Sequence, residues 1–230
     1  MTTSSQIFTE ATDPDVMTPR EAAGVLSDAP WHRFGVFGDS LSLGVGDATP
    51  GYDGAGWPVR VEQALRRIHP DLDYLNTAVV GVTTERALRE QKARMDDFAP
   101  DLLHLGSGAN DIMRREPDWG RIEDDLRAMY EWAAATGAQS SVFTLGNAFV
   151  VPAFPDFTDR VARLNDITRM LADEHGTVVA ECWNHPVNER PNLLSADRIH
   201  FAAVGQAVIS SIMVRALGER LVSLRSQRHC

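Results

Sequence analysis

The sequence predicts one α/β domain built around a five-stranded parallel sheet with helices on both faces. Between residues 33 and 217, short apolar runs alternate with amphipathic segments of about 10–15 residues, a pattern typical of βαβ units. The chain shows no internal repeat and no Pro/Gly/Ser-rich linker that would divide this region. These observations favour a doubly wound fold over two small domains.

Each element is expected from its own apolar pattern and end signals. The expected strands are 33–37, 74–80, 102–105, 141–145 and 177–182. The expected helices are 58–68, 84–98, 122–135, 159–174 and 203–217. Val61, Leu65 and Ile68 share one face of the first helix, and Pro100 ends the second. Gly137 and Gly176 follow the third and fourth helices, where glycine commonly ends a helix.

The composition of the 230-residue chain is that of a globular protein, with 43% hydrophobic and 23% charged residues. Its 22 basic and 32 acidic residues leave a net charge of −10, which disfavours binding to nucleic acid or to an anionic membrane surface. The chain has no apolar run long enough to span a membrane, and residues 1–19 lack the features of a secretion signal. We therefore expect a cytoplasmic protein.

The sequence gives no sign of a metal or cofactor site. Cys182 and Cys230 lack metal-ligand spacing, so we expect neither a disulfide framework nor a zinc site. His185 lies near Cys182, but no further ligand follows at a suitable spacing. The segment Gly44-Val45-Gly46 lacks the third glycine of a dinucleotide-binding fingerprint.

Residues able to do chemistry follow the predicted strands. Ser40 comes after the first strand, Gly81 after the second and Asn110 after the third. Asp197 and His200 precede the last helix. Because the carboxyl ends of parallel strands meet at one edge of a sheet, we expect these five residues to lie close together.

This set supplies what a serine hydrolase needs. Ser40 offers a hydroxyl nucleophile, His200 an imidazole to take its proton, and Asp197 a carboxylate to orient that imidazole. The backbone N–H groups of Ser40 and Gly81 and the carboxamide of Asn110 offer donors for an oxyanion. Glycine suits position 81 because the backbone there must approach the substrate closely.

The same residues give the sequence a resemblance to a known family. The four segments are Gly38-Asp39-Ser40-Leu41-Ser42, Asn76 to Gly81, Gly108-Ala109-Asn110-Asp111 and Asp197-Arg198-Ile199-His200. Their residues and their order resemble the four sequence blocks of the SGNH hydrolases, also called GDSL-type esterases and lipases. The resemblance covers residues 33–217.

The resemblance implies a flavodoxin-like three-layer α/β/α sandwich and ester hydrolysis or acyl transfer without a metal. It implies Ser40, Asp197 and His200 as catalytic residues, with Ser40, Gly81 and Asn110 forming the oxyanion hole. The hydrolase domain is expected over 31–220, preceded by an arm over 1–30 and followed by a tail over 221–230. The arm is expected to be partly disordered or to contain a short helix starting at Pro19.

Each candidate residue also has a purely structural explanation. Ser40 or Asp197 can cap a helix or turn, and Asn110 can be a turn residue beside glycine. The presence of all four segments favours the chemical roles for these three. We expect Asp39 to brace the nucleophile turn and Asp111 to hold the loop after the third strand.

Two loops are expected to shape specificity, 47–56 and 147–157. The second is apolar, and it either holds an acyl or aromatic group or packs on its own core. His185 either lines the pocket or lies in a surface loop.

The function expected from these observations is cleavage of a small-molecule carboxylic ester through an acyl-enzyme on Ser40. Two alternatives stay open. One is transfer of the acyl group to an alcohol or amine by the same site in a biosynthetic pathway. The other is a catalytically silent binding module on this fold, against which the intact Ser40, Asn110 and His200 argue.

Overall fold

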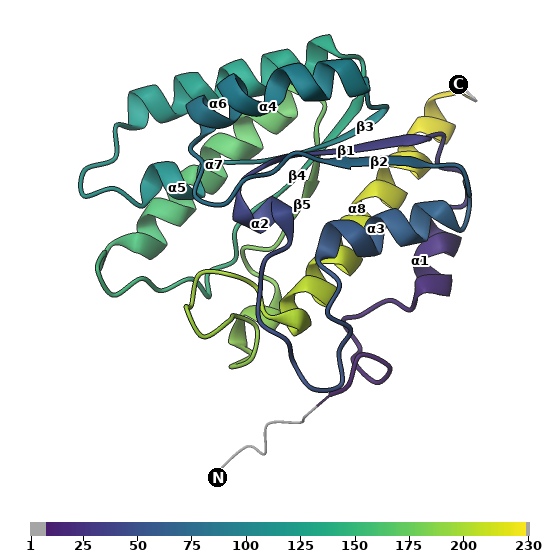
Figure 1. The fold of residues 1–230 in the computed structure, drawn as a ribbon, viewed down its shortest axis with the longest axis horizontal. Coiled ribbons are helices and arrows are strands. Elements are labelled where there is room, and N and C mark those ends of the chain that lie inside the picture. Colours follow the sequence, from purple (N-terminus) through teal and green to yellow (C-terminus); the bar gives the residue numbers. More distant parts are fainter. Residues whose placement is uncertain (1–7, 229–230) are drawn as a thin grey trace.

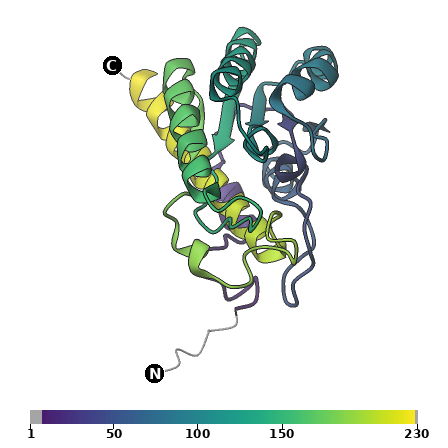
Figure 2. The same ribbon diagram turned by 90° about the vertical axis from the view of Figure 1, so that its left-hand side faces the viewer.

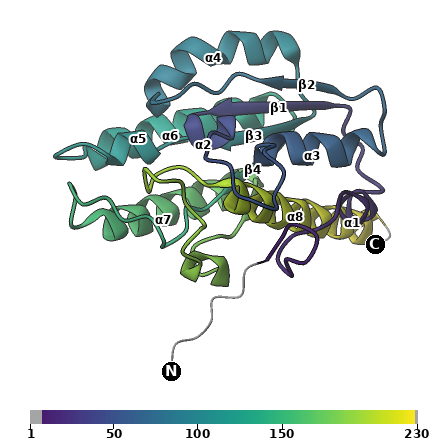
Figure 3. The ribbon, with the colours of Figure 1, turned by 60° about the horizontal axis from the view of Figure 1, so that its bottom comes forward.

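The computed structural model describes residues 8–228 and contains the expected parallel sheet (Figure 1). The strands are β1 (Arg33–Gly38), β2 (Asp73–Asn76), β3 (Leu102–Gly106), β4 (Gln139–Phe143) and β5 (Val178–Ala180). Their order is β2-β1-β3-β4-β5, and every neighbouring pair is parallel. Figure 3 shows the order from β2 at the edge through β1 and β3 to β4. The predicted fold class is confirmed.

Helices cover both faces of this sheet. They are α1 (Pro19–Val25), α2 (Ser40–Leu43), α3 (Trp57–Arg66), α4 (Thr84–Phe98), α5 (Ala109–Ile112), α6 (Trp119–Ala135), α7 (Phe157–His175) and α8 (Ala203–Arg228), with a 3-10 turn at Pro186–Glu189. Helices α4, α6 and α7 pack beside one another on one face, and α1, α3 and α8 pack together on the other. The result is a three-layer α/β/α sandwich. No helix within residues 8–228 is both long and apolar enough to cross a membrane.

Several strands end earlier than their apolar patterns predict, and side-chain oxygens accept backbone N–H groups just beyond two of these ends. The second strand ends at Asn76, whose Oδ1 accepts the Ala78 N–H at 2.9 Å. The fourth ends before Leu145, whose N–H donates to Asn165 Oδ1 at 2.9 Å. Polar side chains therefore bind the backbone where these strands end, at the edge of the sheet that is expected to carry the site.

The helix predictions differ from the structure mainly at helix ends. Helix α4 has the bounds expected from the sequence, whereas α8 continues past Leu217 to Arg228 with Leu221 buried. The short helices α2 and α5, which no periodicity indicated, lie at the same end of the sheet (Figure 3). Helix α1 starts with a capping box formed by Thr18 and Glu21. Cys230 lies outside the described residues.

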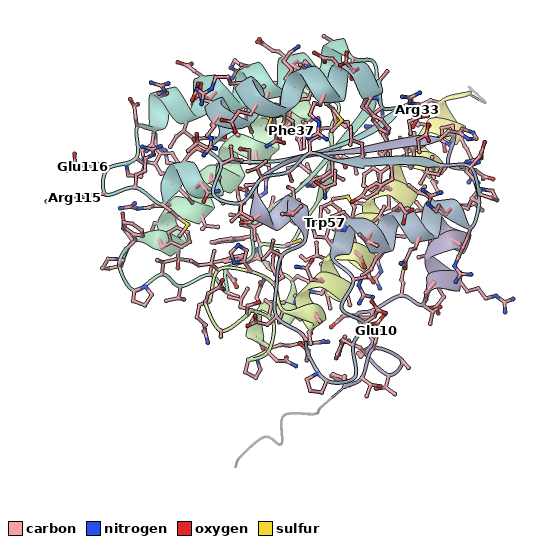
Figure 4. The ribbon with its side chains drawn as sticks, viewed as in Figure 1. Glu10, Arg33, Phe37, Trp57, Arg115 and Glu116 are labelled. Carbon is pink, nitrogen blue, oxygen red and sulfur yellow. The ribbon has the colours of Figure 1, made fainter. Side chains whose placement is uncertain are left out.

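Trp57, at the start of α3, contacts the nucleophile helix α2 (Figure 4 labels Trp57). Its side chain is fully buried and its Nε1–H donates to the Leu41 carbonyl oxygen at 2.8 Å. Its ring packs edge-on against Phe143 of β4, with ring centroids 5.6 Å apart. A residue of the apolar core thus anchors α2 directly.

Gln91, on α4, holds the end of β1 from the other face. Its Oε1 accepts the Gly38 N–H at 3.0 Å, and its Nε2 donates to the Gly38 carbonyl oxygen at 2.8 Å. Gly38 has a φ of +142°, and a Cβ there would lie 1.8 Å from the carbonyl oxygen of Gly106. Glycine is therefore required where β1 leads into the nucleophile turn, and Gln91 satisfies its polar groups.

Replacing Gln91 with leucine should destabilise the protein by about 1–3 kcal/mol, because the buried Gly38 N–H loses its partner. Urea denaturation of wild type and Gln91→Leu measures the difference. Gln63→Leu, at an exposed position of α3, is the matched control and should change the free energy of unfolding by less than about 0.5 kcal/mol. Equal effects of the two substitutions would contradict this role for Gln91.

Candidate active site

Ser40 starts α2 immediately after β1. The N-cap of α2 is Asp39, whose Oδ1 accepts the Leu41 N–H at 2.9 Å. The alternative explanation of Ser40 as a helix cap is therefore wrong, and the capping role belongs to its neighbour. The helix ends after one turn at Gly44, which has a φ of +82°. This short turn presents the Ser40 hydroxyl at the carboxyl end of β1.

Ser40, His200 and Asp197 form a continuous hydrogen-bonded line. Ser40 Oγ lies 2.8 Å from His200 Nε2, and His200 Nδ1 lies 2.6 Å from Asp197 Oδ2. Ser40 is buried, and the side chain of His200 is 16% exposed. The structure thus brings together the hydroxyl, imidazole and carboxylate that the sequence placed far apart.

Asp197 combines the two roles that the sequence left as alternatives. Its Oδ1 accepts the backbone N–H groups of Ile199 and His200, while its Oδ2 faces the imidazole. Burial alone would raise the pKa of Asp197, but hydrogen bonds from the backbone and ring of His200 outweigh it and hold this pKa below its ordinary value. Arg198, between them, has a φ of +61°, an unfavourable conformation for a side-chain-bearing residue. This tight turn places the carboxylate beneath the ring.

Asn110 lies between the nucleophile turn and the loop after β2. Its Nδ2 is 3.0 Å from the Val82 carbonyl oxygen and 3.4 Å from Asp39 Oδ2. Gly81, next to Val82, has a φ of +73°, and a Cβ there would meet no atom within 4 Å. The carboxamide and the glycine N–H therefore belong to segments that meet beside Ser40.

Two acidic residues brace this arrangement. Asp111 Oδ2 accepts from the backbone N–H and the hydroxyl of Thr84, both at 3.1 Å, and so ties α5 to the start of α4. Asp39 is 2% exposed. Its burial raises its pKa to about 7, with the charge of Asp111 adding to the rise and the Leu41 N–H opposing it. The contact of Asp39 with the Leu41 N–H and the contacts of Asp111 with Thr84 match the bracing roles expected for these two residues.

The remaining candidates have structural environments. Cys182 is buried, and burial raises the pKa of its thiol, so it is a poor nucleophile. His185 Nδ1 accepts the Val187 N–H at 3.2 Å and caps the 3-10 turn. In the loop 147–157, Phe149 is buried against Phe201, with ring centroids 5.4 Å apart. The Phe149 ring therefore packs on the residue that follows His200. For this part of the loop, the structure agrees with the alternative in which the loop packs on its own core.

Sequence reasoning missed the residue that joins the nucleophile segment to the histidine segment. Asp47 donates its N–H to Ser195 Oγ at 2.8 Å, and its Oδ2 accepts the Ala196 N–H at 2.8 Å. Its carbonyl oxygen accepts the Ala203 N–H at 2.9 Å. Figure 2 shows the two segments side by side, with the loop after α2 in dark blue and the segment before α8 in yellow-green. No sequence signal indicates contacts across 148 residues.

Within the described part of the chain, no group of three or more His, Cys, Asp or Glu side chains is placed to hold a metal ion. The candidate site brings together one hydroxyl, one imidazole, one carboxylate and nearby N–H donors.

A sequence profile of the GDSL-like lipase/acylhydrolase family matches residues 36–208. The chain belongs to this family of SGNH or GDSL hydrolases, and it is an ester hydrolase.

Individual relatives agree with this membership. An arylesterase from Vibrio mimicus is 26% identical over 187 residues, which are 81% of this chain and 88% of the relative. Two solved structures share the fold. LAE5, an α/β hydrolase from a Lake Arreo metagenome, has a TM-score of 0.67 and 22% identity over 81% of this chain and 95% of its own. The esterase EstA from Pseudoalteromonas sp. has a TM-score of 0.63 and 19% identity over 83% of this chain and 98% of its own.

Asp39→Asn should change the pH dependence of stability. Because burial raises the pKa of Asp39 from 3.8 to about 7, the native state binds this proton more tightly than the unfolded state does. Wild type therefore loses stability as pH rises from about 4 to about 7, by on the order of a few kcal/mol, and the neutral amide does not. Denaturation of both proteins across this range measures the difference.

The stability advantage of Asp39→Asn should thus grow with pH and level off above about pH 7. Asp97→Asn, at an exposed position of α4, is the control and should give a small difference at every pH. An advantage of Asp39→Asn that is the same at low and high pH would contradict the buried, proton-binding carboxyl.

Proposed function

We propose that this protein hydrolyses small carboxylic esters through an acyl-enzyme on Ser40. The observation that carries the proposal is the line from Ser40 Oγ through His200 to Asp197, with contacts of 2.8 Å and 2.6 Å. A serine hydroxyl is a weak nucleophile unless a base within hydrogen-bond reach takes its proton. His200 Nε2 is at that distance, and Asp197 fixes which ring nitrogen carries the hydrogen.

In the first half-reaction, Ser40 Oγ attacks the ester carbonyl carbon while its proton passes to His200 Nε2. The carbonyl oxygen becomes an oxyanion, and the ring becomes an imidazolium facing the Asp197 carboxylate. The C–O bond to the alcohol then breaks, and the leaving oxygen takes the proton from Nε2. The acid part stays esterified to Ser40.

In the second half-reaction, water replaces the alcohol. His200 Nε2 takes a proton from the water, whose oxygen attacks the acyl carbon. The bond from that carbon to Ser40 Oγ breaks, and Oγ recovers the proton. The products are the free acid and the free alcohol, and the enzyme returns to its starting state.

The oxyanion is stabilised by the backbone N–H groups of Ser40 and Gly81 and by the Asn110 carboxamide. Asn110 Nδ2 lies 3.0 Å from the Val82 carbonyl oxygen and 3.4 Å from Asp39 Oδ2. The 3.4 Å contact is the weaker of the two, so an oxyanion displaces it at the lower cost. Donors aimed at developing charge act mainly on the transition state.

We take aryl esters as the first substrate class to test. The Vibrio mimicus relative is an arylesterase, and phenols leave more readily than alkyl alcohols. p-Nitrophenyl esters of graded acyl length therefore test activity and acyl preference in one assay.

Ser40→Ala should abolish this hydrolysis while leaving the fold intact. Loss of a nucleophile costs on the order of 10⁴ to 10⁶ in kcat. The measurement is the steady-state rate with p-nitrophenyl acetate, alongside circular dichroism of wild type and variant. A variant that keeps a tenth of the wild-type rate would overturn the assignment of Ser40.

Asp197→Asn should impair turnover more than Asp197→Ala. The amide can donate to the His200 ring where an acceptor is needed, which favours the wrong tautomer and costs about 10⁴ in kcat in a comparable triad. Alanine imposes no wrong hydrogen bond. Because the Asp197 side chain is 47% exposed, both variants should melt near wild type.

Steady-state kinetics at neutral pH compares the two Asp197 variants. Wild-type kcat in Asp197→Ala would show that this residue only caps the turn before His200. The site would then be a Ser40–His200 dyad.

A further inference from the structure

An arm over residues 8–17 lies against the two loops that build the site. We call residues 44–56 the nucleophile loop and residues 181–202 the catalytic loop, which carries Asp197 and His200. The family profile begins at residue 36, so the arm lies outside the matched region. Its contacts are therefore features of this chain that the proposed function does not use.

Asp13 of the arm binds both loops at once. Its Oδ2 accepts the Tyr52 hydroxyl of the nucleophile loop at 2.7 Å and Arg190 Nη1 of the catalytic loop at 2.6 Å. Its Oδ1 accepts Arg190 Nη2 at 2.9 Å. The Asp13 side chain has 0% exposure, and that of Arg190 has 18%. One buried carboxylate thus joins the two loops.

The chemistry of this contact favours a geometric role. A two-pronged Arg–carboxylate pair fixes direction as well as distance, because the guanidinium is planar. Burial alone would raise the pKa of Asp13, but hydrogen bonds from Arg190, from the Asp15 backbone N–H and from Tyr52 hold it below its ordinary value. Arg190 Nη2 also donates to Asp15 Oδ2, so Arg190 keeps one carboxylate partner when Asp13 is removed, but the two-pronged contact and the link to Tyr52 are lost.

The two loops meet again beside the catalytic pair, through the contacts of Asp47 with Ser195 and Ala196. A displacement that carries these contacts with it changes the position of Asp197 and His200 relative to Ser40. A misplacement of about 1 Å in a reacting group can cost about 100-fold in rate.

We propose that Asp13 is a positioning residue, which holds Arg190 and Tyr52 so that the catalytic loop keeps His200 facing Ser40. This inference rests on the proposed function. The arm is then a built-in part of the active-site scaffold.

The test is the kinetics of Asp13→Ala and Asp13→Asn with p-nitrophenyl acetate, well below their melting temperatures. We expect kcat to fall about 10- to 100-fold with KM changed less than about three-fold, because alignment and not substrate binding is lost. Labelling of Ser40 by a fluorophosphonate should slow by a similar factor. Tyr52→Phe, which removes only one hydroxyl and keeps the fold, should lower kcat in the same sense but less.

Glu10→Ala is the matched control from the same arm. Glu10 pairs with Arg60 of α3 at 2.6 and 3.0 Å and accepts the Asp53 N–H, so its side chain binds α3 and the nucleophile loop and not the catalytic loop (Figure 4 labels Glu10). The kcat of Glu10→Ala should stay within about two-fold of the wild-type kcat. The double variant Asp13→Ala/Arg190→Ala should be no slower than Arg190→Ala alone, since the two residues act as one unit.

Wild-type kcat in Asp13→Asn and Tyr52→Phe, with only a lowered melting temperature, would overturn the inference. An equal loss of kcat in Glu10→Ala would also overturn it. Both results leave the proposed function intact as long as Ser40 remains essential and labelled. Activity that survives in Ser40→Ala would instead refute the proposed function itself.

Discussion

The hydrogen bond between Ser40 Oγ and His200 Nε2 joins residues 160 positions apart, and the surrounding structure serves to keep it formed. One such bond contributes only about 1 kcal/mol net, which is too little to hold two loops together. Contacts elsewhere in the structure hold the two loops in place. Trp57 and Gln91 fix the end of β1 and helix α2 from opposite faces of the sheet. Asp47 then fastens the histidine segment to the nucleophile segment.

The site itself costs stability. Asp39 is a buried carboxyl with a raised pKa, and Arg198 occupies a left-handed conformation that costs on the order of 1–2 kcal/mol. The Asp197–His200 pair is partly exposed, so solvent weakens its contribution to folding. Strained or desolvated groups collected at one place are typical of a functional site, where geometry is maintained at the expense of stability. Trp57 and Phe201 are buried core residues, of which Trp57 packs next to the nucleophile helix and Phe201 is next to His200 in the sequence.

Much of this architecture is predictable from the sequence. The alternation of apolar runs and amphipathic segments indicates the parallel sheet, and helix 84–98 has the predicted bounds. Ser40, Asn110 and His200 are recognisable because each follows or adjoins an element that delivers it to one edge of the sheet. The strand ends were less predictable, because apolar residues continue past Asn76 and Phe143, where side-chain acceptors such as Asn76 and Asn165 bind the backbone.

The contacts of the arm could not be predicted, for a physical reason. Asp13 and Arg190 are 177 residues apart, and neither belongs to a periodic pattern. From the sequence alone, an isolated charged residue in a polar segment is expected to lie on the solvent-exposed surface. Only the folded geometry shows that the Asp13 carboxylate has lost its contact with solvent and has exchanged it for Arg190 and Tyr52.

The most direct test of the account is the rate at which an organophosphonate modifies Ser40 in wild type and in His200→Ala, with the adduct located by peptide mass spectrometry. If His200 takes the proton from Ser40, wild type carries the adduct on Ser40 and His200→Ala reacts at least about 100-fold more slowly. An adduct on another residue, or equal rates in the two proteins, would contradict the central claim that His200 activates Ser40.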